Sequence, residues 1–214
     1  MKDWYELYAN DIKNNGGIES YFNKKVINRK KLIKKINEYT DQGKIVEAGC
    51  GSGVLSVELC RMGHQVIAID NNKKILELAK KINKAITNNK IEAISADIFD
   101  IDKVLENETI DVIFSVGVFE HFNDKDIIKL LKKQLKISKY VFLAILTKYF
   151  NDDEALYGNE RFMRFKKWRE LINQASGTII EEFSCQNTNI WGRIKNVKKY
   201  FRPAPIRTFV IKER

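Results

Sequence analysis

The chain has 214 residues, of which 44% are hydrophobic and 31% are charged, a balance typical of a globular protein with one buried core. No apolar run approaches the roughly 18 residues of a membrane helix, and the start MKDWYELYAN is unlike a secretory signal. The three cysteines, Cys50, Cys60 and Cys185, form no framework for disulfides or zinc. We therefore expect a cytoplasmic protein. The net charge of +10 permits a nucleic-acid partner but does not identify one.

Two helical patterns come first along the chain. Residues 3–13 and 20–39 space their apolar side chains at helical intervals, and NNGG at 14–17 separates them. Outside its apolar stripe, the second pattern is mostly lysine and arginine, with no acid between residue 21 and Glu38. We expect residues 1–42 to form a helical lid on a core of residues 43–214, within a single domain of residues 1–214.

From residue 44 onward, strand and helix patterns alternate. Apolar strands are predicted at 44–48, 65–70, 90–96, 109–116 and 140–146, with helices at 53–62, 73–86, 100–106 and 124–137. Strands that are apolar on both faces and alternate with amphipathic helices predict a parallel sheet covered on both sides. The last third differs: a helix at 163–175 stops at Gly177 and is followed by strands at 178–185 and 207–213.

The turn after the first strand is unusually rich in glycine. Gly49, Gly51 and Gly53 fall within five positions, and glycine there permits a tight turn and close approach of a ligand to the backbone. In an open parallel sheet, ligands bind beyond the carboxyl ends of the strands, at the switch in strand order. Asp70 ends the second strand, where a carboxylate can accept hydrogen bonds from both hydroxyls of a ribose.

Two details distinguish between adenosine cofactors. The dinucleotide fingerprint places Gly or Ala at the sixth position counted from Gly49, and this chain has Val54 there. Glu47 precedes the glycine loop, and an acid at that place would repel a pyrophosphate but attract a cation. S-adenosylmethionine, which has a ribose, an ammonium and a sulfonium, fits both details.

Four motifs in order resemble those of class I S-adenosylmethionine-dependent methyltransferases. They are VEAGCGSG (46–53), VIAIDNN (66–72), SADIF (95–99) and DVIFSVGVFEHF (111–122), and residues 164–183 are similar to the penultimate helix, glycine turn and sixth strand of that family. The resemblance covers roughly residues 44–186. It implies a three-layer, Rossmann-like α/β sandwich with a seven-stranded, mostly parallel sheet, an antiparallel last strand and an N-terminal helical cap.

The resemblance also implies a role for each matching position around S-adenosylmethionine and its product S-adenosylhomocysteine. Glu47 would lie near the ammonium group, and three glycines would line the methionine part: Gly49, Gly51 and Gly53. The sulfonium side would meet the backbone of three residues at the end of the fourth strand: Ser115, Val116 and Gly117. Around the adenosine, Asp70 would hold the ribose, Asn71 would lie beside the adenine, Asp97 would accept from its amino group, and the Ile98 N–H would donate to its ring.

Methyl transfer is an in-line displacement, so the protein mainly has to align the acceptor and, where needed, deprotonate it. His121 in FEHF is the candidate general base, because its ordinary pKa is suitable, and packing or cofactor contact is its alternative role. Glu120 could orient His121 or cap the next helix. His64 is interpreted as a residue of a surface turn. No cluster of acids and histidines has metal-ligand spacing, so no metal is expected.

Aromatic residues are expected to cover the acceptor side. The N-terminal helices supply Trp4, Tyr5, Tyr8, Tyr21 and Phe22, which suit a sulfonium through cation–π contact or simply pack the added helices. The long loop at 147–163, with Tyr149 and Tyr157, is expected to select the acceptor.

Three functions stay open at this point. The first is methylation of an O, N or C atom of a small molecule. The second is RNA methylation, using the basic helix 22–36 and the basic segment 193–202. The third is a non-catalytic S-adenosylmethionine-binding partner protein, which the intact motifs argue against.

Overall fold

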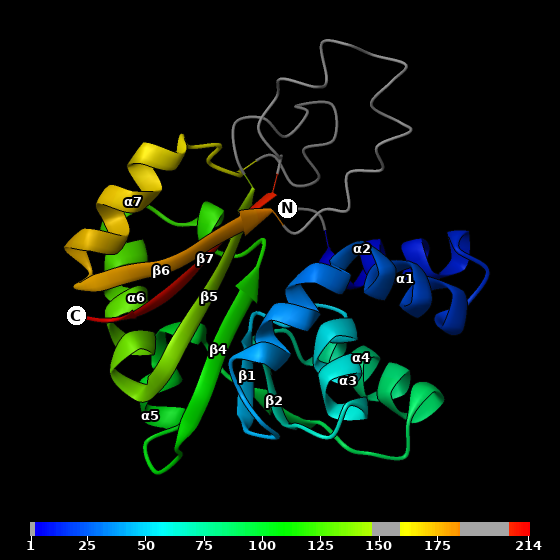
Figure 1. Cartoon of the computed structure of the whole chain (residues 1–214). Coiled ribbons are helices and arrows are strands. Elements are labelled where there is room, and N and C mark those ends of the chain that lie inside the picture. The colour runs from blue at the N-terminus through cyan, green and yellow to red at the C-terminus, as the bar shows by residue number, and fades with distance from the viewer. Residues whose placement is uncertain (1–2, 147–158, 185–205) are drawn as a thin grey trace, which may run out of the picture.

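A seven-stranded sheet forms the centre of the molecule in the computed structural model, which describes residues 3–146, 159–184 and 206–214 (Figure 1). The strand order is β3-β2-β1-β4-β5-β7-β6. The strands are β1 (Lys44–Ala48), β2 (Gln65–Asp70), β3 (Glu92–Ser95), β4 (Ile110–Val116), β5 (Ser138–Leu146), β6 (Gly177–Ser184) and β7 (Ile206–Glu213).

The pairing of the strands confirms the predicted mixed sheet. Strands β1 to β5 pair in parallel, whereas β7 runs antiparallel to both of its neighbours, β5 and β6. The last strand of the chain is therefore inserted between the fifth and the sixth. The order changes direction at β1, which lies between β2 and β4, and this is the switch point where a crevice forms in such sheets.

Helices cover both faces of the sheet, and the layers are separate in Figure 1. The helices α2 (Ile18–Glu38), α3 (Val54–Arg61) and α4 (Lys73–Ile86) lie on one face, with α1 (Trp4–Asn14) outside them. The opposite face carries α5 (Ile101–Val104), α6 (Asp124–Ile137) and α7 (Phe165–Gln174). Two short 3-10 helices follow β3 and β4: η1 (Ile98–Asp100) and η2 (Phe119–His121).

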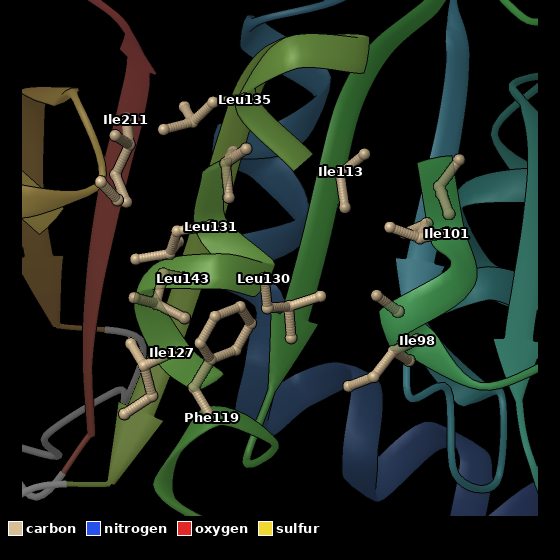
Figure 2. Packing of buried hydrophobic residues seen from close by; sticks show 14 of the residues in the cluster. Ile98, Ile101, Ile113, Phe119, Ile127, Leu130, Leu131, Leu135, Leu143 and Ile211 are labelled. Carbon is tan, nitrogen blue, oxygen red and sulfur yellow. The ribbon is translucent and has the colours of Figure 1, made fainter. Parts of the chain in front are cut away.

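The core between β4, β5 and α6 fixes the elements that reach the functional site (Figure 2). Ile127, Leu131 and Leu135 repeat every four residues along α6 and are buried against the sheet. Phe119 of η2 is fully buried in the same cluster. Burying a side chain of this size contributes about 1.5–3 kcal/mol, so Phe119 anchors the short helix that also carries His121.

One local prediction was wrong, and the turn after α7 differs in detail from the expected glycine turn. Its left-handed residue is Ser176, with φ +63°, and Gly177 begins β6. Glycine is needed there because an added Cβ would lie 2.7 Å from Cγ2 of Ile211 on β7. His64, predicted in a surface turn, is 5% exposed and makes a 2.9 Å hydrogen bond to Oδ1 of Asn37, because α2 covers it.

Among the helices of the described segments, none has an apolar stretch long enough to cross a membrane.

Candidate functional site

A cavity of about 570 Å³ opens beyond the carboxyl ends of β1, β2, β3 and β4. Its walls come from the turns after these four strands, from α1 and from Asn159. The lining residues are Trp4, Tyr8, Gly49, Gly51, Asp70, Asn71, Asn72, Ile75, Asp97, Ile98, Phe99, Val116, Gly117, Val118, His121, Phe122 and Asn159. The motifs predicted after the four strands thus meet in one cavity.

The turn after β1 forms one wall of the cavity and needs glycine for two separate reasons. Gly49 and Gly51 have left-handed φ angles of +74° and +52°, which other residues rarely adopt. A Cβ on Gly49 would lie 2.7 Å from Cγ2 of Val118, and one on Gly51 would overlap the hydroxyl of Tyr8. The absence of side chains at Gly49 and Gly51 therefore lets Val118 and Tyr8 pack directly against the backbone of this turn.

Gly53 does not line the cavity, although it was predicted to do so with the other two glycines. It has φ +70° at the N-terminus of α3, and an added Cβ would lie 2.6 Å from Cβ of Ala79 on α4. The absence of a side chain at Gly53 thus permits close packing of α3 on α4.

Glu47 lies behind the glycine turn, not at its mouth, and is 4% exposed. Its Oε2 accepts hydrogen bonds from the backbone N–H of Ser56 at 3.0 Å and from the Ser56 hydroxyl at 2.5 Å. Because the N-cap Gly53 has no side chain, the carboxylate of Glu47 satisfies an N–H in the first turn of α3 instead. Burial raises the pKa of Glu47 to about 8. Glu47 is not among the lining residues.

Asp70 joins the glycine turn to the start of α4. Its Oδ2 accepts from the Gly51 N–H at 3.1 Å and its Oδ1 from the Asn72 N–H at 3.0 Å. The carboxylate also lines the cavity, as does the neighbouring Asn71. Burial raises the pKa of Asp70 above its ordinary value. Two backbone donors hold this carboxylate in one orientation toward the cavity.

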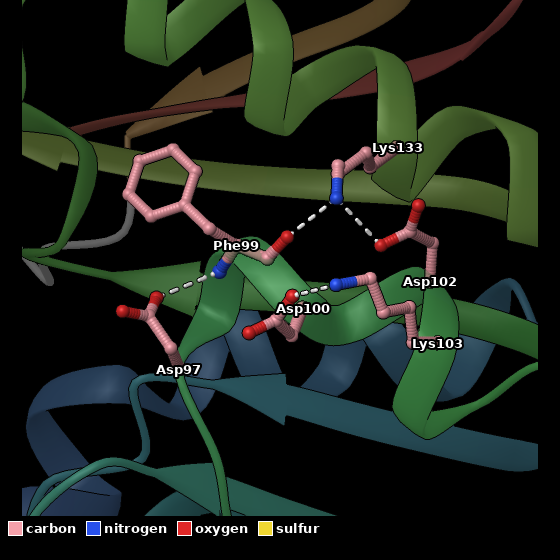
Figure 3. A network of polar contacts seen from close by, with 6 residues as sticks. All are labelled: Asp97, Phe99, Asp100, Asp102, Lys103 and Lys133. Atoms are coloured by element: carbon pink, nitrogen blue, oxygen red, sulfur yellow. Dashed lines mark hydrogen bonds and ion pairs between the residues drawn. The ribbon is translucent and has the colours of Figure 1, made fainter.

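The segment after β3 is held against α6 by a network of polar contacts (Figure 3). Oδ1 of Asp97 accepts from the Phe99 N–H at 2.9 Å and caps η1. The ammonium of Lys133 on α6 donates to the Phe99 carbonyl at 2.5 Å and to Asp102 at 2.7 Å. These contacts fix the position of Asp97 and Ile98, which both line the cavity.

At the end of β4, the three residues predicted for the sulfonium side divide between core and cavity. Ser115 is 1% exposed and is not a lining residue. Val116 and Gly117 line the cavity, and Gly117 has φ +70°. An added Cβ on Gly117 would have Oε1 of Glu120, 4.0 Å away, as its nearest neighbour, so the space beside Gly117 is open toward the cavity.

His121, Asn159 and Trp4 form the far end of the cavity. Nδ1 of His121 lies 2.8 Å from Oδ1 of Asn159, and the Trp4 ring meets the imidazole edge-on with ring centroids 5.7 Å apart. With the amide oxygen as acceptor, Nδ1 carries the proton, so Nε2 of the neutral imidazole keeps its lone pair. Asn159 comes from no recognisable motif, and the sequence analysis missed it, as it missed Phe99 and Phe122.

The aromatic residues predicted for the lid divide into two groups. Trp4 and Tyr8 line the cavity and stack with ring centroids 6.3 Å apart. Tyr21 is fully buried and donates its hydroxyl to Oγ of Ser52 at 3.0 Å, and its burial raises its pKa to about 12. Tyr21 and the buried Phe22 therefore belong to a hydrophobic cluster of the core, and Tyr5 packs against the same cluster. Tyr149, Tyr157 and the basic segment 193–202 lie outside the described residues.

The charge of the described cavity wall is negative. Asp70 and Asp97 contribute carboxylates, and the lining residues of the described segments include no lysine or arginine. Such a wall favours a cation and disfavours a pyrophosphate. The described residues also contain no group of three or more His, Cys, Asp or Glu side chains that could hold a metal ion.

Comparisons with known proteins agree with this geometry. A family model described as a methyltransferase domain matches residues 45–139. The ubiquinone biosynthesis O-methyltransferase of Pelagibacter ubique is 37% identical over 106 residues, which are 49% of this chain and 42% of that protein. Its counterpart from Bartonella tribocorum is 28% identical over 176 residues, covering 73% of this chain and 70% of that protein. The chain thus spans less than half the length of the Pelagibacter protein.

Solved structures show the same fold. Magnesium protoporphyrin IX methyltransferase from Synechocystis, solved with bound S-adenosylmethionine, has a TM-score of 0.65 at 12% identity and covers 91% of this chain and 81% of its own. An S-adenosylmethionine-dependent methyltransferase from Clostridium acetobutylicum has a TM-score of 0.65 at 15% identity, covering 85% of this chain and 89% of its own.

Proposed function

We propose that this chain, which belongs to the class I S-adenosylmethionine-dependent methyltransferases, transfers a methyl group from S-adenosylmethionine to an O, N or C atom of a small molecule. The observation that carries the proposal is the single cavity that joins the glycine turn, Asp70, Asp97 and the residues after β4. Its carboxylates and the absence of lysine and arginine from its described wall suit a ligand with a ribose and positive charge.

The residues present fit S-adenosylmethionine, which supplies a methyl group already activated on a sulfonium. Asp70 is oriented toward the cavity by two backbone N–H groups and would accept from the ribose hydroxyls. Asp97 and Ile98 would hold the adenine, with Asn71 beside it. Gly49 and Gly51 would lie along the methionine part, and Val116 and Gly117 along the sulfonium side. Glu47, which bonds to Ser56 of α3 and does not line the cavity, would not contact the ammonium directly.

Residues 1–42 would form the lid and residues 43–214 the core. The lid would close the acceptor end with Trp4 and Tyr8, so the protein can exclude water while the acceptor is aligned. A covered aromatic end of this kind suits a small acceptor better than a polymer. The relatives, which include ubiquinone biosynthesis O-methyltransferases and phosphoethanolamine N-methyltransferases, support the same class.

His121 would act as the general base. Its Nδ1 is bonded to Asn159 and its ring lines the cavity, so its Nε2 is the nitrogen that can take a proton from an acceptor. An acceptor that needs no deprotonation would leave His121 a packing role beside Trp4.

Two measurements test the proposal. Calorimetry should show micromolar binding of S-adenosylhomocysteine and weaker or no binding of NAD, whereas tighter binding of NAD would overturn the assignment of the cavity. A transfer assay with methyl-labelled S-adenosylmethionine should then be run against 3,4-dihydroxybenzoate, phosphoethanolamine, a general metabolite pool and total RNA. Label that enters RNA alone, with steep salt dependence, would favour the RNA alternative based on the basic helix 22–36.

A further inference from the structure

Glu120 is a fully buried carboxyl group that the proposed transfer reaction does not use. It lies in η2 between the core residue Phe119 and the cavity residue His121, and it is 0% exposed. Its Oε1 accepts from the backbone N–H of Leu146, at the end of β5, at 3.0 Å. Its Oε2 has no hydrogen-bond partner among the described residues. Burying a carboxyl group with one oxygen unpaired costs free energy that its remaining contacts must offset.

The backbone of Glu120 makes a second connection. Its carbonyl oxygen accepts from the Arg161 N–H at 2.8 Å. The Arg161 guanidinium in turn donates to the Phe122 carbonyl at 2.5 Å and to Oδ1 of Asp124 at 2.6 Å. Arg161 lies only two residues beyond Asn159, the hydrogen-bond partner of His121. One residue therefore bonds both to the end of β5 and to the segment that supplies Asn159.

We propose that Glu120 is a positioning residue: its carboxyl group fixes the end of β5 against η2, so that His121 and Asn159 keep their relative position at the acceptor end of the cavity. This inference rests on the proposed function, because fixing His121 and Asn159 matters only if an acceptor is aligned beside them. Glu120 is not a lining residue, so it acts through His121 and Asn159.

The simpler roles considered for Glu120 do not match its contacts. It does not cap α6, because Oδ1 of Asn123 accepts from the Asp126 N–H at 3.1 Å and supplies that cap. Nδ1 of the His121 ring is oriented by Asn159. Burial, with a smaller contribution from the nearby carboxylate of Glu160, raises the pKa of Glu120 to about 7.

The experiment compares Glu120→Leu with Glu120→Gln. Leucine keeps much of the volume and brings no buried charge, so we expect it to fold, but it cannot accept from Leu146. Glutamine keeps an oxygen that can accept from Leu146. Asn83→Leu is the matched control, because Asn83 is 6% exposed, accepts from the Ile91 N–H at 2.9 Å and does not line the cavity.

Two measurements are made on the ligand-free proteins by NMR, namely amide hydrogen exchange and the pH titration of the His121 ring. In Glu120→Leu we expect exchange at Leu146 and Arg161 to become faster by on the order of tenfold, with a changed His121 titration midpoint. Glu120→Gln should restore both. Asn83→Leu should accelerate exchange at Ile91 and leave His121 unchanged.

Two results would overturn the inference. Faster exchange at Leu146 alone, with Arg161 and His121 unchanged, would make Glu120 a local structural residue. A glutamine variant that behaves like the leucine variant would show that acceptance from Leu146 is not what matters. Calorimetry with S-adenosylhomocysteine separates this inference from the proposed function. If the wild-type protein does not bind it, the proposed function fails, and the exchange and titration data still decide the role of Glu120.

Discussion

Gly53 and Gly117 offer a matched pair of substitutions, because they share a φ of +70° and differ in their surroundings. Alanine at either position must adopt a left-handed conformation, which costs about 1–2 kcal/mol. At Gly117 the new Cβ would have its nearest neighbour 4.0 Å away, so steric contact adds little to the loss of stability. At Gly53 it would lie 2.6 Å from Cβ of Ala79 and 3.4 Å from its Cα, which must move with the backbone of α4.

Overpacking of this kind costs about 1–3 kcal/mol in addition. We therefore expect Gly53→Ala to lower the free energy of unfolding by about 2–5 kcal/mol and Gly117→Ala by about 1–2 kcal/mol. Urea denaturation with a common m-value measures both. Because Gly117 lines the cavity and Gly53 does not, S-adenosylhomocysteine should bind more weakly to Gly117→Ala and almost normally to folded Gly53→Ala.

Equal losses of stability in the two variants would refute the reasoning, because the packing of α3 on α4 would then contribute nothing at Gly53. Weaker ligand binding by Gly53→Ala alone would restore the original prediction that Gly53 lines the methionine part of the site.

Three further predictions concern charged and titratable groups. Asp70→Ala should weaken S-adenosylhomocysteine binding by about 1.5–3 kcal/mol, or roughly 10- to 150-fold, in calorimetry, and an unchanged affinity would make Asp70 only a residue of the turn. His121→Ala should lower the rate of methyl transfer by about 100-fold while cofactor affinity stays the same; normal turnover would exclude the base role. Folded Glu47, with a pKa of about 8, holds a proton that the unfolded chain releases near 4.5, so stability should fall as pH rises between these values, by up to about 1.4 kcal/mol per pH unit. Glu47→Gln should make that slope shallower in denaturation at several pH values, and an identical slope would contradict the shifted pKa.

Much of the architecture follows from local pattern. The predicted helices at 73–86 and 124–137 coincide with α4 and α6, because the spacing of buried side chains along a helix is set by its 3.6-residue period. The left-handed glycines after β1 were likewise predictable, because the need for glycine is a property of the local backbone. The sequence alone therefore determined the order of the elements and the edge of the sheet at which the cavity opens.

The tertiary structure decided which side chains face the cavity. Glu47 was predicted beside the ligand, but α3 presents an N–H that lacks a side-chain cap, and the carboxylate turns to Ser56. Tyr21 was predicted in the lid, but α2 packs its face into the core and Tyr21 bonds to Ser52.

Contacts between distant segments were decided in the same way. The insertion of β7 between β5 and β6 leaves no signal in any single segment. Asn159 reaches His121, 38 positions earlier in the chain, only because η2 and the segment after β5 meet at Glu120. Hydrophobic periodicity and secondary-structure propensity are properties of residues close together in the sequence. The direction in which a polar side chain points depends instead on the unpaired donors and acceptors that the completed fold places beside it.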